Sequence, residues 1–273
     1  MSEIVLTAGV RSNLLQLQKT ADLITNTQTK LATGKRVNSA LDSPINYFTA
    51  QGLSSRASDL GSLLDSMSSG ISTLQAANNG ITSITKLVQS AQALASQAQQ
   101  TTDLTVRDGL AAQFDAILGQ IDQMAGDSSF NGINLLDSAN SADLIVTLNE
   151  SGSSTVTVNA VDFTSSGLSV NASNNNWATV AAIALASADL TAALTTLRSQ
   201  AQSFGSNLST VQIRQDFTKA MINTLQTGAD GLTLADSNEE GANLLALQTR
   251  QQLSTTALSL ASQASQAVLR LFQ

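Results

Sequence analysis

The chain has 273 residues, of which 42% are hydrophobic and only 12% are charged, and its net charge is −7. It contains no cysteine and no histidine, which excludes disulfides, thiolate nucleophiles and the commonest general base and zinc ligand. We therefore expect no catalytic residues, no cofactor and no metal site. The acidic balance argues against nucleic acid as a partner. No stretch approaches the roughly 18 apolar residues of a membrane span, so no membrane insertion is expected.

The first predicted element is a helix that ends at Gly34, because glycine commonly follows the last turn of a helix. Within it, apolar residues recur at steps of four and three, which is the seam of a coiled coil. This seam consists of Val10, Leu14, Leu17, Ala21, Ile24, Gln28 and Leu31. A turn follows, and Ser43 and Pro44 fit the N-cap and the first position of the next helix.

The second predicted helix starts at Pro44 and is about 55 residues long, or about 80 Å. Its seam consists of Leu60, Leu64, Met67, Ile71, Leu74, Asn78, Ile81, Thr85, Val88, Gln92 and Ala95. A third helix is predicted to end at Gly126, and its seam consists of Leu110, Phe114, Ile117, Ile121 and Met124.

Three aspartates, Asp108, Asp115 and Asp122, recur every seven residues on the third predicted helix. A row of carboxylates could bind a divalent cation, which prefers oxygen ligands. However, seven residues span about 10 Å along a helix, too far for one ion to bridge. The sequence therefore predicts a solvated face opposite the apolar seam.

Residues 127–176 lack the helical repeat and are predicted to contain a small β-hairpin. Residues 144–148 and 155–158 resemble strands separated by a polar loop, and residues 161–170 are expected to add another strand. Helix resumes near Trp177, and the pair Gly228 and Gly231 is predicted to interrupt it. The seam of this helix consists of Leu190, Leu194, Leu197, Ala201, Phe204, Leu208, Val211, Gln215, Thr218, Ile222 and Leu225.

The final predicted helix starts where Ser237 and Glu240 match a capping box. It carries two adjacent apolar stripes. The first consists of Leu253, Ala257, Leu260, Ala264, Ala267 and Leu271. The second consists of Leu244, Leu247, Leu258, Ala261 and Val268.

These elements predict a mainly α fold: a long antiparallel helical bundle or coiled coil with paired N- and C-terminal helices and a small β-hairpin insert at about 138–176. Residues 1–42 with 229–273 are predicted to form the paired terminal helices, and residues 43–228 the helical rod. The terminal stripes are wider than a two-helix contact needs, so they predict an association surface. Its candidate residues are Val10, Leu14, Leu17, Ala21, Ile24, Leu31, Leu253, Leu260, Ala264, Val268 and Leu271.

Three separated stretches resemble the bacterial flagellin family. Residues 31–40 (LATGKRVNSA), followed by Asp42, resemble its N-terminal signature. Residues 130–136 (FNGINLL) resemble the turn that closes its first helical half, and residues 260–272 (LASQASQAVLRLF) resemble its C-terminal pattern. The resemblance is to short flagellins of the alphaproteobacterial type.

The resemblance implies a structural protein, not an enzyme, that self-assembles into the flagellar filament for swimming motility. It implies secretion to the extracellular flagellum, with the paired terminal helices in the inner filament layer. The implied partners are copies of itself in a helical homopolymer, the flagellar cap and hook-junction proteins, an export chaperone and the export apparatus. The alternative is a secreted hook-junction or adhesin-like helical protein of the same apparatus. A carboxylate-based hydrolase would require a convergent acidic cluster that the sequence lacks.

Overall fold

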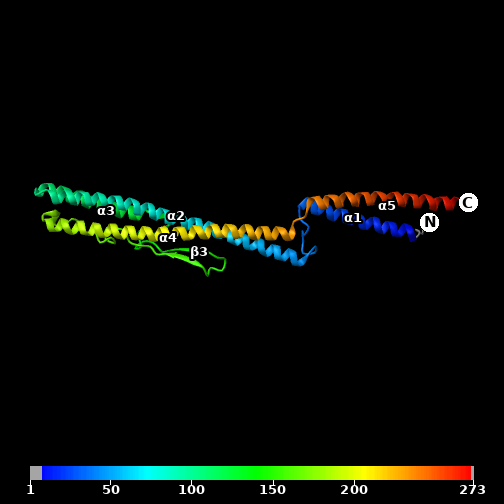
Figure 1. The fold of residues 1–273 in the computed structure, drawn as a ribbon, viewed down its shortest axis with the longest axis horizontal. Helices are drawn as coiled ribbons and strands as arrows, with labels where there is room; N and C mark the ends of the chain where they lie inside the picture. The colour runs from blue at the N-terminus through cyan, green and yellow to red at the C-terminus, as the bar shows by residue number, and fades with distance from the viewer. Residues whose placement is uncertain (1–7, 272–273) are drawn as a thin grey trace. The chain divides into compact units, whose positions relative to one another are not determined.

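The computed structural model describes the backbone of residues 8–271, and the chain divides into two units (Figure 1). Unit 1 combines the residues up to Ser55 with those from Thr224 onward, and unit 2 is Arg56–Asn223. The long helices are α1 (Ala8–Thr33), α2 (Pro44–Gln100), α3 (Leu104–Asp127), α4 (Val180–Thr233) and α5 (Ser237–Leu271). Between α3 and α4 lie β1 (Ser129–Phe130), β2 (Ile133–Asn134), β3 (Leu144–Thr147), β4 (Thr155–Val158) and the short helix η1 (Asn174–Trp177).

Unit 2 is built around a hydrophobic core between α2, α3 and α4. One row of buried residues recurs every seven positions of α2: Met67, Leu74, Ile81, Val88 and Ala95. A second row has the same spacing: Ala77, Ile84, Ala91 and Ala98. Facing residues of the core come from α3 and α4, and they include Phe114, Ile121, Leu190, Leu197 and Phe204. Within unit 2, α2 and α4 lie side by side in opposite directions (Figure 1). The predicted mainly α fold with a small β-hairpin insert is confirmed.

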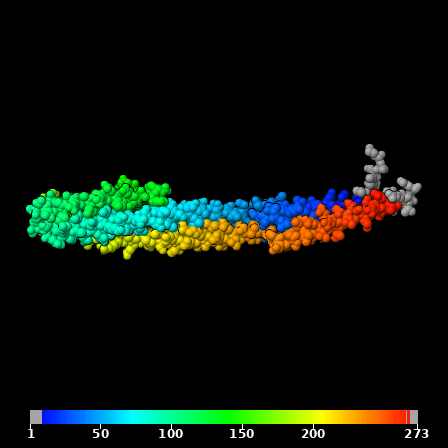
Figure 2. Space-filling view, turned by 90° about the horizontal axis from the view of Figure 1, so that it is seen from above, coloured from blue at the N-terminus to red at the C-terminus, as the bar shows by residue number. Residues whose placement is uncertain are grey.

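The β-hairpin pairs Leu144 with Val158 and Thr147 with Thr155 in antiparallel register. Its buried face lies against α2 at Gly70, where a side chain would have no room. A Cβ atom at Gly70 would lie 2.6 Å from Cγ2 of Val146. The insert, green in Figure 2, stands out on the surface of unit 2.

Two local predictions are wrong. Residues 161–170 form turns instead of a strand, because the carboxylate of Asp162 accepts bonds from the amide and hydroxyl of Thr164 and bends the chain. Gly228 and Gly231 do not interrupt α4, which continues to Thr233. A Cβ atom at Gly228 would lie 3.4 Å from Leu53, so this glycine allows close packing within an intact helix.

The aspartate row of α3 is partly solvated, since Asp108 and Asp122 are exposed as predicted and Asp115 is half-buried, but it also binds another segment of the chain. Each carboxylate accepts hydrogen bonds from the segment that returns from the hairpin to α4. Asp122 accepts from the amide of Ser165 (2.6 Å), and Asp115 accepts from both the amide and the hydroxyl of Ser173 (2.7 Å each). Asp108 accepts from the side-chain amide of Asn176 (2.5 Å). The row therefore holds residues 165–176 along α3.

By length and composition alone, α4 contains a stretch apolar enough to cross a membrane, and 33% of that stretch is buried in the structure. Core helices pass the same test. The buried residues at the start of α4 (Ile183, Leu190 and Leu197) recur on one face, which packs into the core of unit 2.

Candidate assembly surface

The stretch after α1 that resembles the flagellin signature lies beside the connection between α4 and α5. We call the place where these two connections meet the crossing. Gly34 ends α1 with φ of 68°, a left-handed conformation that glycine adopts without steric cost. Its carbonyl accepts the amide of Ala235 (2.9 Å), and the amides of Arg36 and Val37 donate to the carbonyl of Thr233 (2.8 and 3.3 Å). The α1–α2 connection is thus paired to the α4–α5 connection through backbone bonds.

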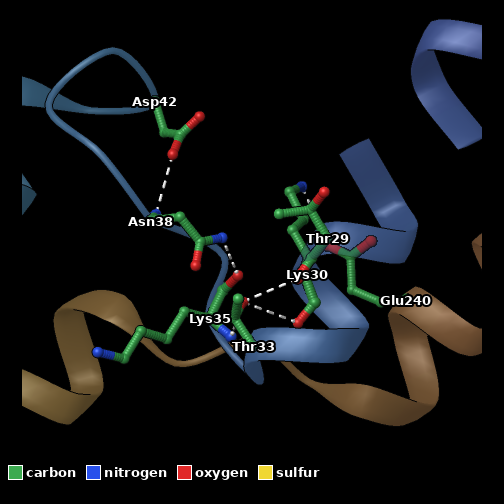
Figure 3. Close-up of polar contacts among 7 residues, drawn as sticks. All are labelled: Thr29, Lys30, Thr33, Lys35, Asn38, Asp42 and Glu240. Carbon is green, nitrogen blue, oxygen red and sulfur yellow. Dashed lines mark hydrogen bonds and ion pairs between the residues drawn. The ribbon is translucent and has the colours of Figure 1, made fainter. Parts of the chain in front are cut away.

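The rest of the signature closes a turn around Asp42, which Figure 3 shows. The carboxylate of Asp42 accepts the amide of Asn38 at 2.9 Å, as the figure shows, and also accepts the amide of Ser39 at 2.9 Å. The hydrogen bond from the amide of Asn38, followed by that from Ser39, holds the pKa of Asp42 below its ordinary value of 3.8. The side chain of Asn38 donates to the carbonyl of Lys35 (2.9 Å), so Asn38 links the crossing to the turn.

One ion pair joins α1 to α5 next to this crossing. Nζ of Lys30 lies 3.1 Å from Oε1 of Glu240, whose side chain is only 13% exposed (Figure 3). Glu240 therefore does not close a capping box as predicted. Asp236 caps α5 instead, since its carboxylate accepts the amide of Asn238 (2.8 Å).

The α1 and α5 helices lie side by side (Figure 1) and bury only part of their apolar surface against each other. Val10, Leu17, Ile24 and Leu31 of the predicted set recur every seven residues and are buried or half-buried, and Ala21 is half-buried. The inward face also includes Thr20, which is fully buried and donates its hydroxyl to the carbonyl of Gln16 (2.9 Å). On α5 the half-buried residues belong to the second predicted stripe: Leu244, Leu247, Leu258 and Ala261.

The first predicted stripe of α5 faces outward. Leu253 is 67% exposed and Leu260 is 68% exposed, seven residues further on, and Ala264 is exposed as well. Leu245 is also 67% exposed. The side chains of Val268 and Leu271, which complete the predicted set, lie outside the described residues.

The outer surface of α1 is apolar too. Leu14 of the predicted set is 40% exposed, and its neighbour Leu15 is 55% exposed. Leu14 also lines an open groove of about 450 Å³ between α1 and α5, together with Val10 and Leu258. The helix pair therefore buries one apolar face and presents another, which is the geometry of an association surface.

Sequence reasoning missed a further exposed group in unit 1. Leu41 is 95% exposed, Ile45 is 80% exposed and Phe48 is 64% exposed. Ile45 and Phe48 are three residues apart in α2 and lie on one side of the helix, and Leu41 belongs to the turn before it. They do not continue the apolar seam of α2 back from Leu60, which would pass through Ala57, Leu53 and Ala50 instead.

Acidic side chains do not gather into a site. Among the residues that the structure describes, no three potential metal ligands come together. The acidic cluster at the start of α5 is divided between helix capping by Asp236 and the ion pair of Glu240.

Both halves of the chain match known proteins. Residues 7–141 match the family model of the bacterial flagellin N-terminal helical region, and residues 188–272 match that of the C-terminal helical region. Flagellin FljO of Caulobacter vibrioides is 30% identical over 274 residues, which cover 100% of this chain and 99% of the relative. The chain belongs to the flagellin family.

Two further comparisons show weaker similarity. A flagellin of Brucella melitensis is 24% identical over the full length of both chains. The crystal structure of Bacillus cereus flagellin superposes with a TM-score of 0.49 at 23% identity, over 55% of this chain and 86% of that one. As a flagellin, this chain is a structural subunit of the bacterial flagellar filament.

Proposed function

We propose that the α1/α5 pair is the surface through which copies of this chain polymerise, and that residues 1–42 with 229–273 form the inner layer of the filament. The observation that carries the proposal is the outward row on α5, where Leu253 and Leu260 are each about two-thirds exposed. Full burial of one leucine side chain contributes about 1.5–3 kcal/mol. A second copy that covers this row supplies that stabilisation at every subunit.

The crossing supports the proposal because it fixes how the two helices are presented. The backbone bonds from Arg36 and Val37 to Thr233 join the connections, and the Lys30–Glu240 pair sets the register of α1 against α5. Because register fixes the relative positions of Leu14 on α1 and Leu253 on α5, the outer surface has one defined pattern for a neighbouring copy to match.

The test compares Leu253→Asp with Gln252→Asp. Both side chains are exposed in the structure, so neither substitution disturbs a core. Leu253→Asp places an unpaired carboxylate in the proposed contact, and its burial there costs several kcal/mol. We expect Leu253→Asp to abolish filaments in electron micrographs while Gln252→Asp assembles at an intermediate level or better.

The fluorescence of Trp177, the only tryptophan, reports in the same samples whether unit 2 is folded. Normal filaments from Leu253→Asp with a folded unit 2 would show that the outward row faces solvent in the polymer. The proposal would then fail, whereas the membership of the flagellin family would stand.

We further propose that the chain is exported to the outside of the cell and has no catalytic role. An export chaperone would cover the exposed leucines of α5 before assembly, and the cap and hook-junction proteins would contact the ends of the polymer. The exposed leucines of α5 favour the binding of a chaperone, since an uncovered row of leucines promotes aggregation. A chaperone that binds the parent chain but not Leu253→Asp and Leu260→Asp would support this assignment. Equal binding to all three would contradict it.

A further inference from the structure

A hollow of about 210 Å³ opens in unit 2 where α2, α4 and the loop of the β-hairpin meet. All three elements contribute to its apolar wall, which consists of Leu60, Leu148, Phe217 and Met221. An apolar cavity of about 150 Å³ can bind benzene, so this hollow has room for one ring and a short arm. Every lining residue belongs to unit 2, and none belongs to the α1/α5 pair.

One buried hydroxyl lines the hollow without a partner. Thr218 is only 2% exposed and is one of the lining residues. Other threonines of α4 donate their hydroxyls to the carbonyl four residues earlier, as Thr210 and Thr233 do at 3.0 Å. The hydroxyl of Thr218 has no hydrogen-bond partner among the residues that the structure describes. Since buried polar groups are normally hydrogen-bonded, Thr218 indicates a polar occupant of the hollow.

A free positive charge lies one helical turn before Thr218. Arg214 lines the hollow, is exposed, and has no hydrogen bond or ion pair with any described residue. The other arginine of the hollow, Arg56, is already paired, since its Nε lies 2.6 Å from Oε1 of Glu150. A guanidinium group binds carboxylates with two parallel hydrogen bonds, so Arg214 selects for an anion in a chain whose net charge is −7.

We propose that the hollow binds a small carboxylate that carries one aromatic ring. The carboxylate accepts hydrogen bonds from Arg214 and from the hydroxyl of Thr218, because residues four apart are neighbours on a helix. The ring lies against the apolar wall, where Phe217 and Met221 supply the aromatic and sulfur contacts that rings favour. The bound acid joins α2, α4 and the hairpin loop, and this site depends on neither polymerisation nor the α1/α5 surface.

The test titrates hydrocinnamate into the free chain and follows the backbone amides by NMR. We expect saturable shifts at residues 148–154 and 214–221, with a Kd on the order of 1 mM for a ligand of this size. Hydrocinnamyl alcohol has the same ring and arm but no charge. It should bind about tenfold more weakly, because hydrogen bonds to a charged group are the stronger ones.

Two variants and one control assign the contacts. Arg214→Gln should weaken the binding of hydrocinnamate about tenfold and leave that of the alcohol unchanged. Arg198→Gln is the matched control, since Arg198 is also exposed on α4 but does not line the hollow, and it should bind hydrocinnamate as the parent does. Thr218→Val replaces the hydroxyl by a methyl group of similar shape and should weaken the binding of hydrocinnamate several-fold. The fluorescence of Trp177 reports in each sample whether unit 2 is folded.

Three results would each overturn the proposal. One is the absence of saturable shifts in the folded parent chain well above the expected Kd. Another is equal binding of the acid and the alcohol by the parent chain, a comparison that needs no variant. The third is equal binding of hydrocinnamate by Arg214→Gln and Arg198→Gln. None of these results would bear on the proposed assembly surface, which lies in unit 1.

Discussion

The two units of this flagellin bury their side chains in opposite ways. Among the described residues, the largest fully buried side chains all lie in unit 2, and they include Trp177, Phe114 and Met67. In the α1/α5 pair the buried residues of α1 are Thr20, Ile24 and Thr27, while Leu14, Leu253 and Leu260 are exposed. Unit 2 therefore has a hydrophobic core of its own, whereas the helix pair leaves leucines exposed that, under the proposed assembly, other copies would cover.

Hydrogen exchange on the free chain and on filaments should give the largest difference between the units. Isolated helices of modest propensity are marginal in water, and local opening free energies range from near zero to that of global unfolding. We expect the amides of α1 and α5 in the free chain to exchange roughly a thousandfold faster than those around Leu74 and Ile81. In filaments, α1 and α5 should become protected. Equal protection of both units in the free chain would mean that the pair is stable without neighbours.

Truncation of an aromatic core residue should give the second-largest difference between the units, in their free energy of unfolding. The ring of Phe114 lies 4.9 Å from that of Trp177, and both side chains are fully buried. Phe114→Ala should lower the free energy of unfolding by about 3–5 kcal/mol, measured in urea by the fluorescence of Trp177. Leu253→Ala is the matched change in unit 1, and it should leave that unfolding curve unchanged while it weakens polymerisation. Similar losses of stability from both variants would contradict the proposed difference between the two units.

The carboxylate row of α3 supplies a smaller effect inside unit 2. Asp115 accepts two hydrogen bonds from Ser173, and bonds to a charged group contribute about 1.5–3 kcal/mol. Asp115→Ala should destabilise unit 2 by about 2 kcal/mol and alter the fluorescence of Trp177, four residues beyond Ser173. The adjacent change Ala116→Ser, at an exposed position, provides the control. A solvated aspartate would give no difference between the two.

This row also shows where sequence reasoning stops. The heptad spacing of Asp108, Asp115 and Asp122 was visible, but their partners lie 68, 58 and 43 residues away in a segment without a helical repeat. Periodicity describes one face of one helix and carries no information about which distant backbone amides will meet it. The fold class, in contrast, follows from repeats within each helix and was predicted correctly.

The seam predicted for α1 was correct in part. Val10, Leu17, Ile24 and Leu31 face inward as expected and Ala21 is half-buried, but Leu14 and Gln28 are exposed, whereas Asn13 is half-buried and Thr20 and Thr27 are buried. Apolarity alone favours Leu14 over Asn13. The structure buries Thr20 because its hydroxyl donates to the carbonyl of Gln16 within the helix, so no polar group is left unpaired. With Thr20 buried, Leu14 is exposed and forms part of the candidate assembly surface.

The smallest predicted effect compares one carboxylate from each unit at acid pH. Hydrogen bonds from the amides of Asn38 and Ser39 lower the pKa of Asp42, and the hydrogen bond from Arg56 lowers that of Glu150. A group whose folded pKa is lowered adds stability above its unfolded pKa, and that stability is lost as the pH falls through the folded value. Both the turn at Asp42 and the tip of the hairpin should therefore loosen only below the ordinary values of 3.8 and 4.5.

Salt should distinguish the two carboxylates, because mobile ions screen an exposed ion pair more strongly than bonds from fixed amides. In NMR titrations of the amides beside each group, added salt should raise the pKa of Glu150 toward 4.5 and change that of Asp42 much less. Asp42→Asn and Glu150→Gln serve as controls, since each removes its own titration and leaves the other in place. If the pKa of Asp42 moved with salt as far as that of Glu150, the charge of Lys30 would govern the signature turn in unit 1. The amides of Asn38 and Ser39 would then not be its main determinant.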